Sequence, residues 1–195
     1  MGSVLRPLAA VAIAALALAA PAAAQQSPRV NDAELVGTSG QDVFCGLAGD
    51  DVLIGMDGDD FLFGDDCGSS LSAAASSDEG GDDTIKGGDG DDALVGDVED
   101  DALNGGPGDD IVTGGSGDDE LRGGADDDSL QGGSGEDTIV GGAGADRVVA
   151  GGAADEIAVV DDDRDLVNCG AGRDSVRADS TDRLTRCEKV VRVRR

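Results

Sequence analysis

The sequence predicts an all-β protein, a right-handed parallel β-roll (solenoid) of nonapeptide repeats with a short C-terminal cap. Two observations predict this fold. From Gly37 the chain divides into units of nine residues, and within each unit an aspartate and an aliphatic residue keep the same phase. The composition agrees, because 33 of the 195 residues are Gly and only 2% are aromatic, which excludes a core of large rings.

Residues 1–24 are typical of a signal peptide that is removed on export. Arg6 supplies positive charge, residues 8–20 form an apolar stretch, and Ala22-Ala23-Ala24 offers a small-residue cleavage site. The stretch is short for a membrane span and is followed by Pro21. We therefore expect no membrane span, secretion to the extracellular space, and a lead-in over residues 25–36. An N-terminal anchor is the alternative.

The repeats occupy residues 37–158, where an insertion loop at residues 66–80 interrupts the fourth of twelve units. The sixth place of every unit is an aspartate: Asp42, Asp51, Asp60, Asp83, Asp92, Asp101, Asp110, Asp119, Asp128, Asp137, Asp146 and Asp155. The eighth place is always aliphatic or Phe, from Phe44 and Leu53 to Val148 and Ile157. A disordered acidic segment has no reason to keep these two residue types in phase.

Each unit is expected to form a turn over its first six positions and a short strand over its last three. The eighth residue then faces inward, while the seventh and ninth face solvent. Two units per coil give two parallel sheets and about six coils around a thin aliphatic core.

The units resemble the nonapeptide G-G-x-G-x-D-x-U-x of RTX (hemolysin-type) calcium-binding repeats, over residues 37–158 and again at 169–177. The resemblance implies that several Ca²⁺ ions lie between successive coils. Their expected ligands are the twelve sixth-position aspartates and Asp174. Turn glycines are the expected source of backbone carbonyl ligands: Gly87, Gly88, Gly105, Gly106, Gly114, Gly115, Gly123, Gly124, Gly132 and Gly133.

The charge of the chain favours cations as partners. Residues 37–158 contain 32 acidic and three basic residues, and the whole chain has a net charge of -28. Carboxylates packed into a short rod repel one another, so we expect the chain to be largely unfolded without Ca²⁺ and to fold when Ca²⁺ binds. Oxygen ligands of flexible geometry suit Ca²⁺ better than Mg²⁺. The same negative charge disfavours nucleic acid as a partner.

The four cysteines, Cys45, Cys67, Cys169 and Cys187, are candidates for two disulfides in an exported protein. Three pairings are open. The local pairs Cys45–Cys67 and Cys169–Cys187 are favoured because they fall at opposite ends of the mature chain. A zinc site is disfavoured, since the chain has no His and no C-x-x-C pair.

Two surfaces leave alternatives open. The odd-numbered units present an apolar outer face formed by Val43, Phe61, Phe63, Ala93, Val95 and Ile111. The insertion loop or residues 28–36 would cover this face, or it would dock a partner. Residues 159–195 have nearly balanced charge, as expected for a solenoid cap, although their basic end could instead bind an anionic cell-surface polymer. Asp179 and Asp182 are candidates for a terminal Ca²⁺ site outside the repeat spacing.

The composition argues against catalysis. Without His, the chain has no Ser-His-Asp or Cys-His arrangement and no His-ligated zinc. The sequence therefore predicts a secreted calcium-binding structural or interaction module that is not an enzyme. The alternative is a Ca²⁺-dependent adhesion or surface-binding protein that uses the apolar outer face to hold a protein or a cell-surface polymer. Ice binding is disfavoured because outward Thr residues are scattered, and a detached repeat domain of an enzyme is disfavoured by the leader.

Overall fold

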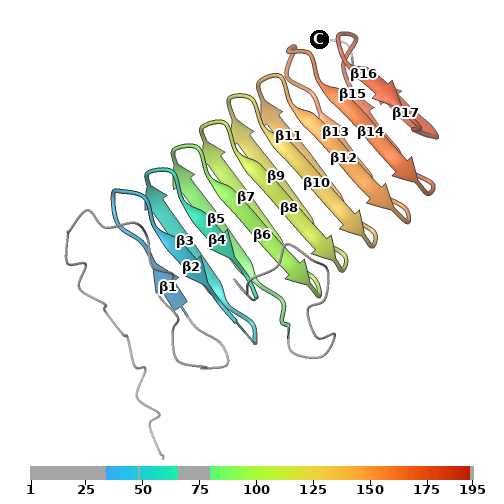
Figure 1. The fold of residues 1–195 in the computed structure, drawn as a ribbon. Coiled ribbons are helices and arrows are strands. Elements are labelled where there is room, and N and C mark those ends of the chain that lie inside the picture. Colours follow the sequence, from blue (N-terminus) through green and yellow to red (C-terminus); the bar gives the residue numbers. More distant parts are fainter. Residues whose placement is uncertain (1–33, 48, 66–79, 194–195) are drawn as a thin grey trace, which may run out of the picture.

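The computed structural model describes residues 34–47, 49–65 and 80–193, and these residues form parallel strands without a helix. Figure 1 shows the strands stacked along one axis from β1 to β17. One sheet contains, in spatial order, β1 (Glu34–Val36), β3 (Val52–Asp57), β5 (Thr84–Asp89), β7 (Ala102–Pro107), β9 (Glu120–Ala125), β11 (Thr138–Ala143), β13 (Glu156–Val159), β15 (Ser175–Ala178) and β17 (Lys189–Arg192). The other contains β2 (Val43–Cys45), β4 (Phe61–Phe63), β6 (Ala93–Val98), β8 (Ile111–Ser116), β10 (Ser129–Ser134), β12 (Arg147–Gly152), β14 (Leu166–Ala171) and β16 (Arg183–Thr185).

The register confirms that two nonapeptides make one coil. Leu103 of β7 lies opposite Leu121 of β9, and Leu130 of β10 lies opposite Val148 of β12, so neighbouring strands are 18 residues apart. The chain alternates between the two sheets, which is the predicted parallel β-roll. Nine and eight strands make about eight coils rather than six, because β1 precedes the first unit and β14 to β17 follow the last one.

The strands are longer than the expected three residues. β8, for example, runs through the last three positions of one unit and the first three of the next. The glycine at the second position explains the difference. Gly106 has a φ of 130°, and a Cβ on it would lie 2.1 Å from the carbonyl oxygen of Gly88. Glycine adopts this φ without strain and lets successive coils approach closely enough to stay in hydrogen-bonding contact, although Met56 and Asp97 hold the same position in β3 and β6 with φ of 94° and 87°.

The core is a double stack of the eighth-position side chains, as predicted. From Leu53 to Ile157 each of them is at most 2% exposed. Phe44, at the first unit, is only partly buried against the stack. The stack continues past the repeats through Val167 and Val176. Each sheet thus contributes a single layer of side chains to the core. Because this core is thin, the stability of the roll depends strongly on the interactions made at the turns on either side.

The structure joins Cys169 of β14 to Cys187, which follows β16, in a disulfide. Cys45 is also disulfide-bonded, while its predicted partner Cys67 lies outside the described residues. The predicted signal peptide at residues 1–24 and most of the insertion loop lie outside them too. No helix that could cross a membrane occurs in the described part of the chain.

Candidate metal centre

The sixth-position aspartates form two ladders, one along each edge of the roll, because each lies immediately before a strand. The edge that leads into the eight-stranded sheet carries Asp42, Asp60, Asp92, Asp110, Asp128 and Asp146, and the opposite edge carries Asp51, Asp83, Asp101, Asp119, Asp137, Asp155 and Asp174. All of them except the half-buried Asp42 are at most 3% exposed. The structure therefore brings the predicted ligands together in two buried rows.

One oxygen of each ladder carboxylate has a fixed partner. Oδ1 of Asp110 accepts the backbone N–H of Asp92, one coil earlier, at 2.8 Å, and Oδ1 of Asp128 accepts that of Asp110 at 2.9 Å. The other edge repeats the pattern, with the N–H of Asp83 donating to Oδ1 of Asp101 at 2.8 Å. These bonds hold the ladder carboxylates from Asp60 to Asp174 in the same orientation.

The second oxygen of these carboxylates is buried and has no hydrogen-bond partner. This is true of Oδ2 in Asp60, Asp83, Asp92, Asp101, Asp110, Asp119, Asp128, Asp137, Asp146, Asp155, Asp165 and Asp174. Buried polar atoms in proteins are nearly always paired, and an unpaired carboxylate oxygen is especially costly. A row of such atoms, all turned the same way, is suited to bind cations.

Backbone carbonyl oxygens border the same space. A Cβ placed on Gly105 would lie 2.1 Å from Oδ2 of Asp110 and 2.8 Å from the carbonyl oxygen of Gly123 on the next coil. The same arrangement brings the carbonyls of Gly87, Gly105 and Gly114 to Asp60, Asp92 and Asp101. Carboxylate and carbonyl oxygens together are the ligand set that Ca²⁺ prefers, so the residues present fit this ion.

The carbonyl oxygens of the glycines at the second position of the units face a different part of the roll. The carbonyl oxygen of Gly88 faces Gly106, and those of Gly106, Gly115, Gly124 and Gly133 likewise face the second glycine of the following coil. They border neighbouring backbone rather than the aspartate oxygens.

The family comparison agrees with this geometry. A model of the RTX calcium-binding nonapeptide repeat matches four times, at residues 36–66, 77–103, 95–130 and 122–157, which together cover more than half of the chain. The chain belongs to the RTX calcium-binding repeat family. No curated protein matches it.

Burial raises the pKa of the buried ladder aspartates of this RTX roll from Asp60 to Asp155. The pKa of Asp101 is raised to about 8, and those of Asp110 and Asp128 to about 7. Desolvation is the largest cause; the amide hydrogen bond from the preceding coil opposes it, and neighbouring carboxylates add to it. Without a cation, burial therefore opposes the ionisation of Asp101, Asp110 and Asp128 near neutral pH.

Sequence reasoning predicted Asp174 beyond residue 158 but missed Asp165 and Glu188, which also continue the ladders. The N–H of Asp146 donates to Oδ1 of Asp165, and the N–H of Asp165 donates to Oδ1 of Asp182. On the other edge the N–H of Asp174 donates to Glu188. Asp165 was missed because it follows Asp146 by 19 residues instead of 18. The signal that could have found it is the buried Val167 two residues later.

A further row of carboxylates lies on the surface. The aspartates at the fifth position accept the backbone N–H of the next coil, as Asp91 does from Asp109 at 2.9 Å and Asp100 does from Asp118 at 2.7 Å. Their bonds run in the opposite direction to those of the ladders. These hydrogen bonds link successive coils. The side chains also keep contact with water, because they are exposed.

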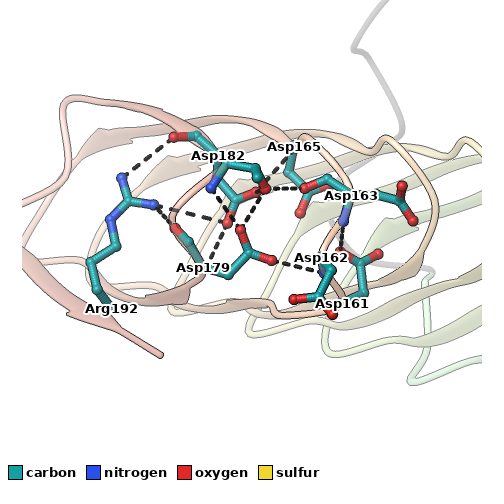
Figure 2. Close-up of polar contacts among 8 residues, drawn as sticks. Asp161, Asp162, Asp163, Asp165, Asp179, Asp182 and Arg192 are labelled. Atoms are coloured by element: carbon teal, nitrogen blue, oxygen red, sulfur yellow. Dashed lines mark hydrogen bonds and ion pairs between the residues drawn. The ribbon is translucent and has the colours of Figure 1, made fainter. Parts of the chain in front are cut away.

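At the C-terminal end an arginine meets the ladder (Figure 2). The guanidinium of Arg192 donates to the backbone carbonyls of Asp179 and Asp182 and lies 4.0 Å from Oδ2 of Asp182. Asp179 and Asp182, considered above as a terminal Ca²⁺ site, are thus already in contact with a cation of the chain itself.

Proposed function

We propose that this RTX protein is a secreted structural module whose β-roll folds when Ca²⁺ binds along the two aspartate ladders. The observation that carries the proposal is the row of buried Oδ2 atoms without partners. Each of them would gain a positive partner from Ca²⁺, so ion binding would contribute directly to the free energy of folding.

The proposed ligands are the Oδ2 atoms of the predicted aspartates and the carbonyl oxygens of the first glycine of each unit. The carbonyls of Gly87, Gly105, Gly114 and Gly123 support this choice because they lie beside the carboxylates. When bound, Ca²⁺ supplies charge neutralisation. The chain supplies oriented oxygens, held by the amide bonds between coils.

Secretion is part of the proposal. The leader at residues 1–24 directs export, and the disulfide between Cys169 and Cys187 suits an oxidising compartment. Extracellular Ca²⁺ concentrations are high enough to fill sites of modest affinity. The roll would then stay unfolded inside the cell and fold outside it, without any catalytic role.

A second function is favoured by one specific observation, the apolar outer face of the eight-stranded sheet. Phe61 of β4 is 43% exposed and Ile111 of β8 is 59% exposed. The two side chains lie two strands apart on the same face, with Ala93 of β6 between them. Large apolar side chains exposed on one face of a sheet are suited to contact with a partner. The function would be Ca²⁺-dependent adhesion to a protein or a cell-surface polymer.

The test is a Ca²⁺ titration of the purified protein followed by far-UV circular dichroism, with Mg²⁺ as the control ion. We expect the β signal to rise cooperatively with Ca²⁺ and to stay low with Mg²⁺. An unchanged spectrum at about 10 mM Ca²⁺, above the weak extracellular affinity range, would refute the proposal.

A further inference from the structure

The last irregular turn of the roll brings three carboxylates together. Asp146, Asp161 and Asp165 each offer an oxygen, and these oxygens all lie within 4.8 Å of one another. Within residues 34–47, 49–65 and 80–193 this is the one group of three or more acidic side chains that come this close. Asp161 belongs to no repeat position, so neither the nonapeptide pattern nor the family match, which ends at residue 157, includes it.

Two of the three side chains are fully enclosed and lack a partner for one oxygen. Asp146 is 1% exposed and Asp165 is 0% exposed, and Oδ2 of each accepts no hydrogen bond. Neither of the two ion pairs among the described residues, Arg122–Glu120 and Arg192–Asp182, involves the three carboxylates. The group therefore concentrates negative charge beside buried oxygens that need a cation.

An extra residue in the chain explains how Asp161 reaches this place. In regular coils the amide at the fourth position donates to a backbone carbonyl of the next coil, as Gly108 does to Ala125 at 3.0 Å. At Gly144 the acceptor is instead Oδ2 of Asp161, at 2.9 Å. The inserted residue displaces the backbone, with Asp162 at a φ of 98°, and a carboxylate takes the position of a carbonyl.

The glycine of the regular site is replaced as well. Next to Gly141 the nearest group of the following coil is Cγ1 of Val159, 3.1 Å from a Cβ placed on Gly141, where Gly105 and Gly123 meet glycine carbonyls. Val159 thus stands where the regular coils have a glycine, and a carboxylate of the same turn, that of Asp161, accepts the Gly144 amide. Figure 2 shows Asp161, Asp163 and Asp165 on this turn, beside the coil that carries Asp179 and Asp182.

We propose that Asp146, Asp161 and Asp165 form a terminal Ca²⁺ site with more carboxylate ligands than the sites of the regular coils, and that this site fills first. The inference rests on the proposed calcium binding. Affinity for Ca²⁺ rises with the number of charged ligands and with the rigidity of the site, and here each of the three carboxylates accepts a backbone amide of the preceding coil.

The test is a calorimetric Ca²⁺ titration of the purified, disulfide-intact protein and of Asp161→Asn. The variant keeps an oxygen that accepts the Gly144 amide but loses one negative charge. The matched control is Asp163→Asn, which removes the same charge from an exposed side chain two residues away. We expect the unsubstituted protein to bind one ion per chain before the main transition, Asp161→Asn to lose at least about tenfold of that affinity, and the control to keep it.

The outcomes separate the two proposals. If all three proteins fold with Ca²⁺ and their first binding steps are the same, the terminal site is refuted while the proposed function stands. If none of them binds Ca²⁺, the proposed function fails and the site with it. Should Asp161→Asn fail to reach the folded spectrum at saturating Ca²⁺, the unsubstituted protein still decides, because a binding curve without an early one-ion step overturns the inference.

Discussion

The regular coils and the last coils of the roll neutralise buried carboxylates in different ways. In the regular coils Oδ2 of Asp110 is buried without a partner, and burial raises the pKa of Asp110 to about 7. In the last coils the hydroxyl and the amide of Thr181 donate to Asp179 and lower its pKa, and Arg192 contacts the same turn. Among the described residues, no donor of the chain reaches these Oδ2 atoms in the regular coils, whereas the C-terminal end carries donors of its own.

The last coils also differ from the regular coils in their disulfide and in their balance of charge. The disulfide between Cys169 and Cys187 staples the last coils, and residues 159–195 contain nine basic residues against eight acidic ones. Residues 37–158 contain three basic residues against 32 acidic ones. A region with its own cross-link and counter-charges needs less from Ca²⁺. Calcium dependence should therefore vary along the rod.

The largest effect is expected from removing two ladder charges in the regular coils. The double variant Asp110→Asn, Asp128→Asn keeps the amide acceptors but weakens the proposed sites, so the Ca²⁺ midpoint of folding should rise by about tenfold or more. Far-UV circular dichroism measures the midpoint. The matched control is Asp109→Asn, Asp127→Asn, which removes the same charge from the exposed row. Equal midpoints for the two double variants would contradict the ligand assignment.

Acidification should partly replace Ca²⁺ in the regular coils. The folded-state pKa values of the buried ladder aspartates from Asp60 to Asp155 lie above the ordinary 3.8, at about 7 for Asp110 and Asp128. Between these values the folded chain binds more protons than the unfolded chain, so metal-free stability falls as pH rises and grows as pH is lowered. In a chelator, lowering the pH from 8 to 5 should increase the β signal. A loss of β signal on acidification would contradict this prediction.

The smallest effect is expected at the C-terminal end. Arg192→Gln removes the guanidinium that contacts Asp179 and Asp182, and should weaken the last coil by about 1 kcal/mol because the side chain is partly exposed. Faster hydrogen exchange of the β15 amides in Ca²⁺ would report it. Arg177→Gln serves as the control, because Arg177 lies on the exposed side of β15. Indistinguishable exchange in the two variants would mean that Arg192 adds no stability.

Much of the fold could be predicted because the repeat is strict. The constant positions of Asp110 and Val112 in their unit predicted which side chains line the edge of the roll and which fill its core. The coil of 18 residues followed from the same repeat. The strand length could not be predicted, since it depends on how closely Gly106 approaches Gly88 in the neighbouring coil. Asp161 and Asp165 were missed for a related reason. One inserted residue breaks the spacing in the sequence, while the backbone absorbs it at Asp162 and restores the ladder.

The most direct test of the central claim is amide hydrogen exchange of the purified protein with and without Ca²⁺, resolved along the chain. The backbone amides of Asp92, Asp110 and Asp128 each donate to a ladder carboxylate of the next coil. We predict strong protection of these amides in Ca²⁺ and near-complete loss of it in a chelator at pH 8, with a smaller loss in the disulfide-linked last coils. Equal protection of the regular coils in both conditions would contradict the claim that Ca²⁺ stabilises them.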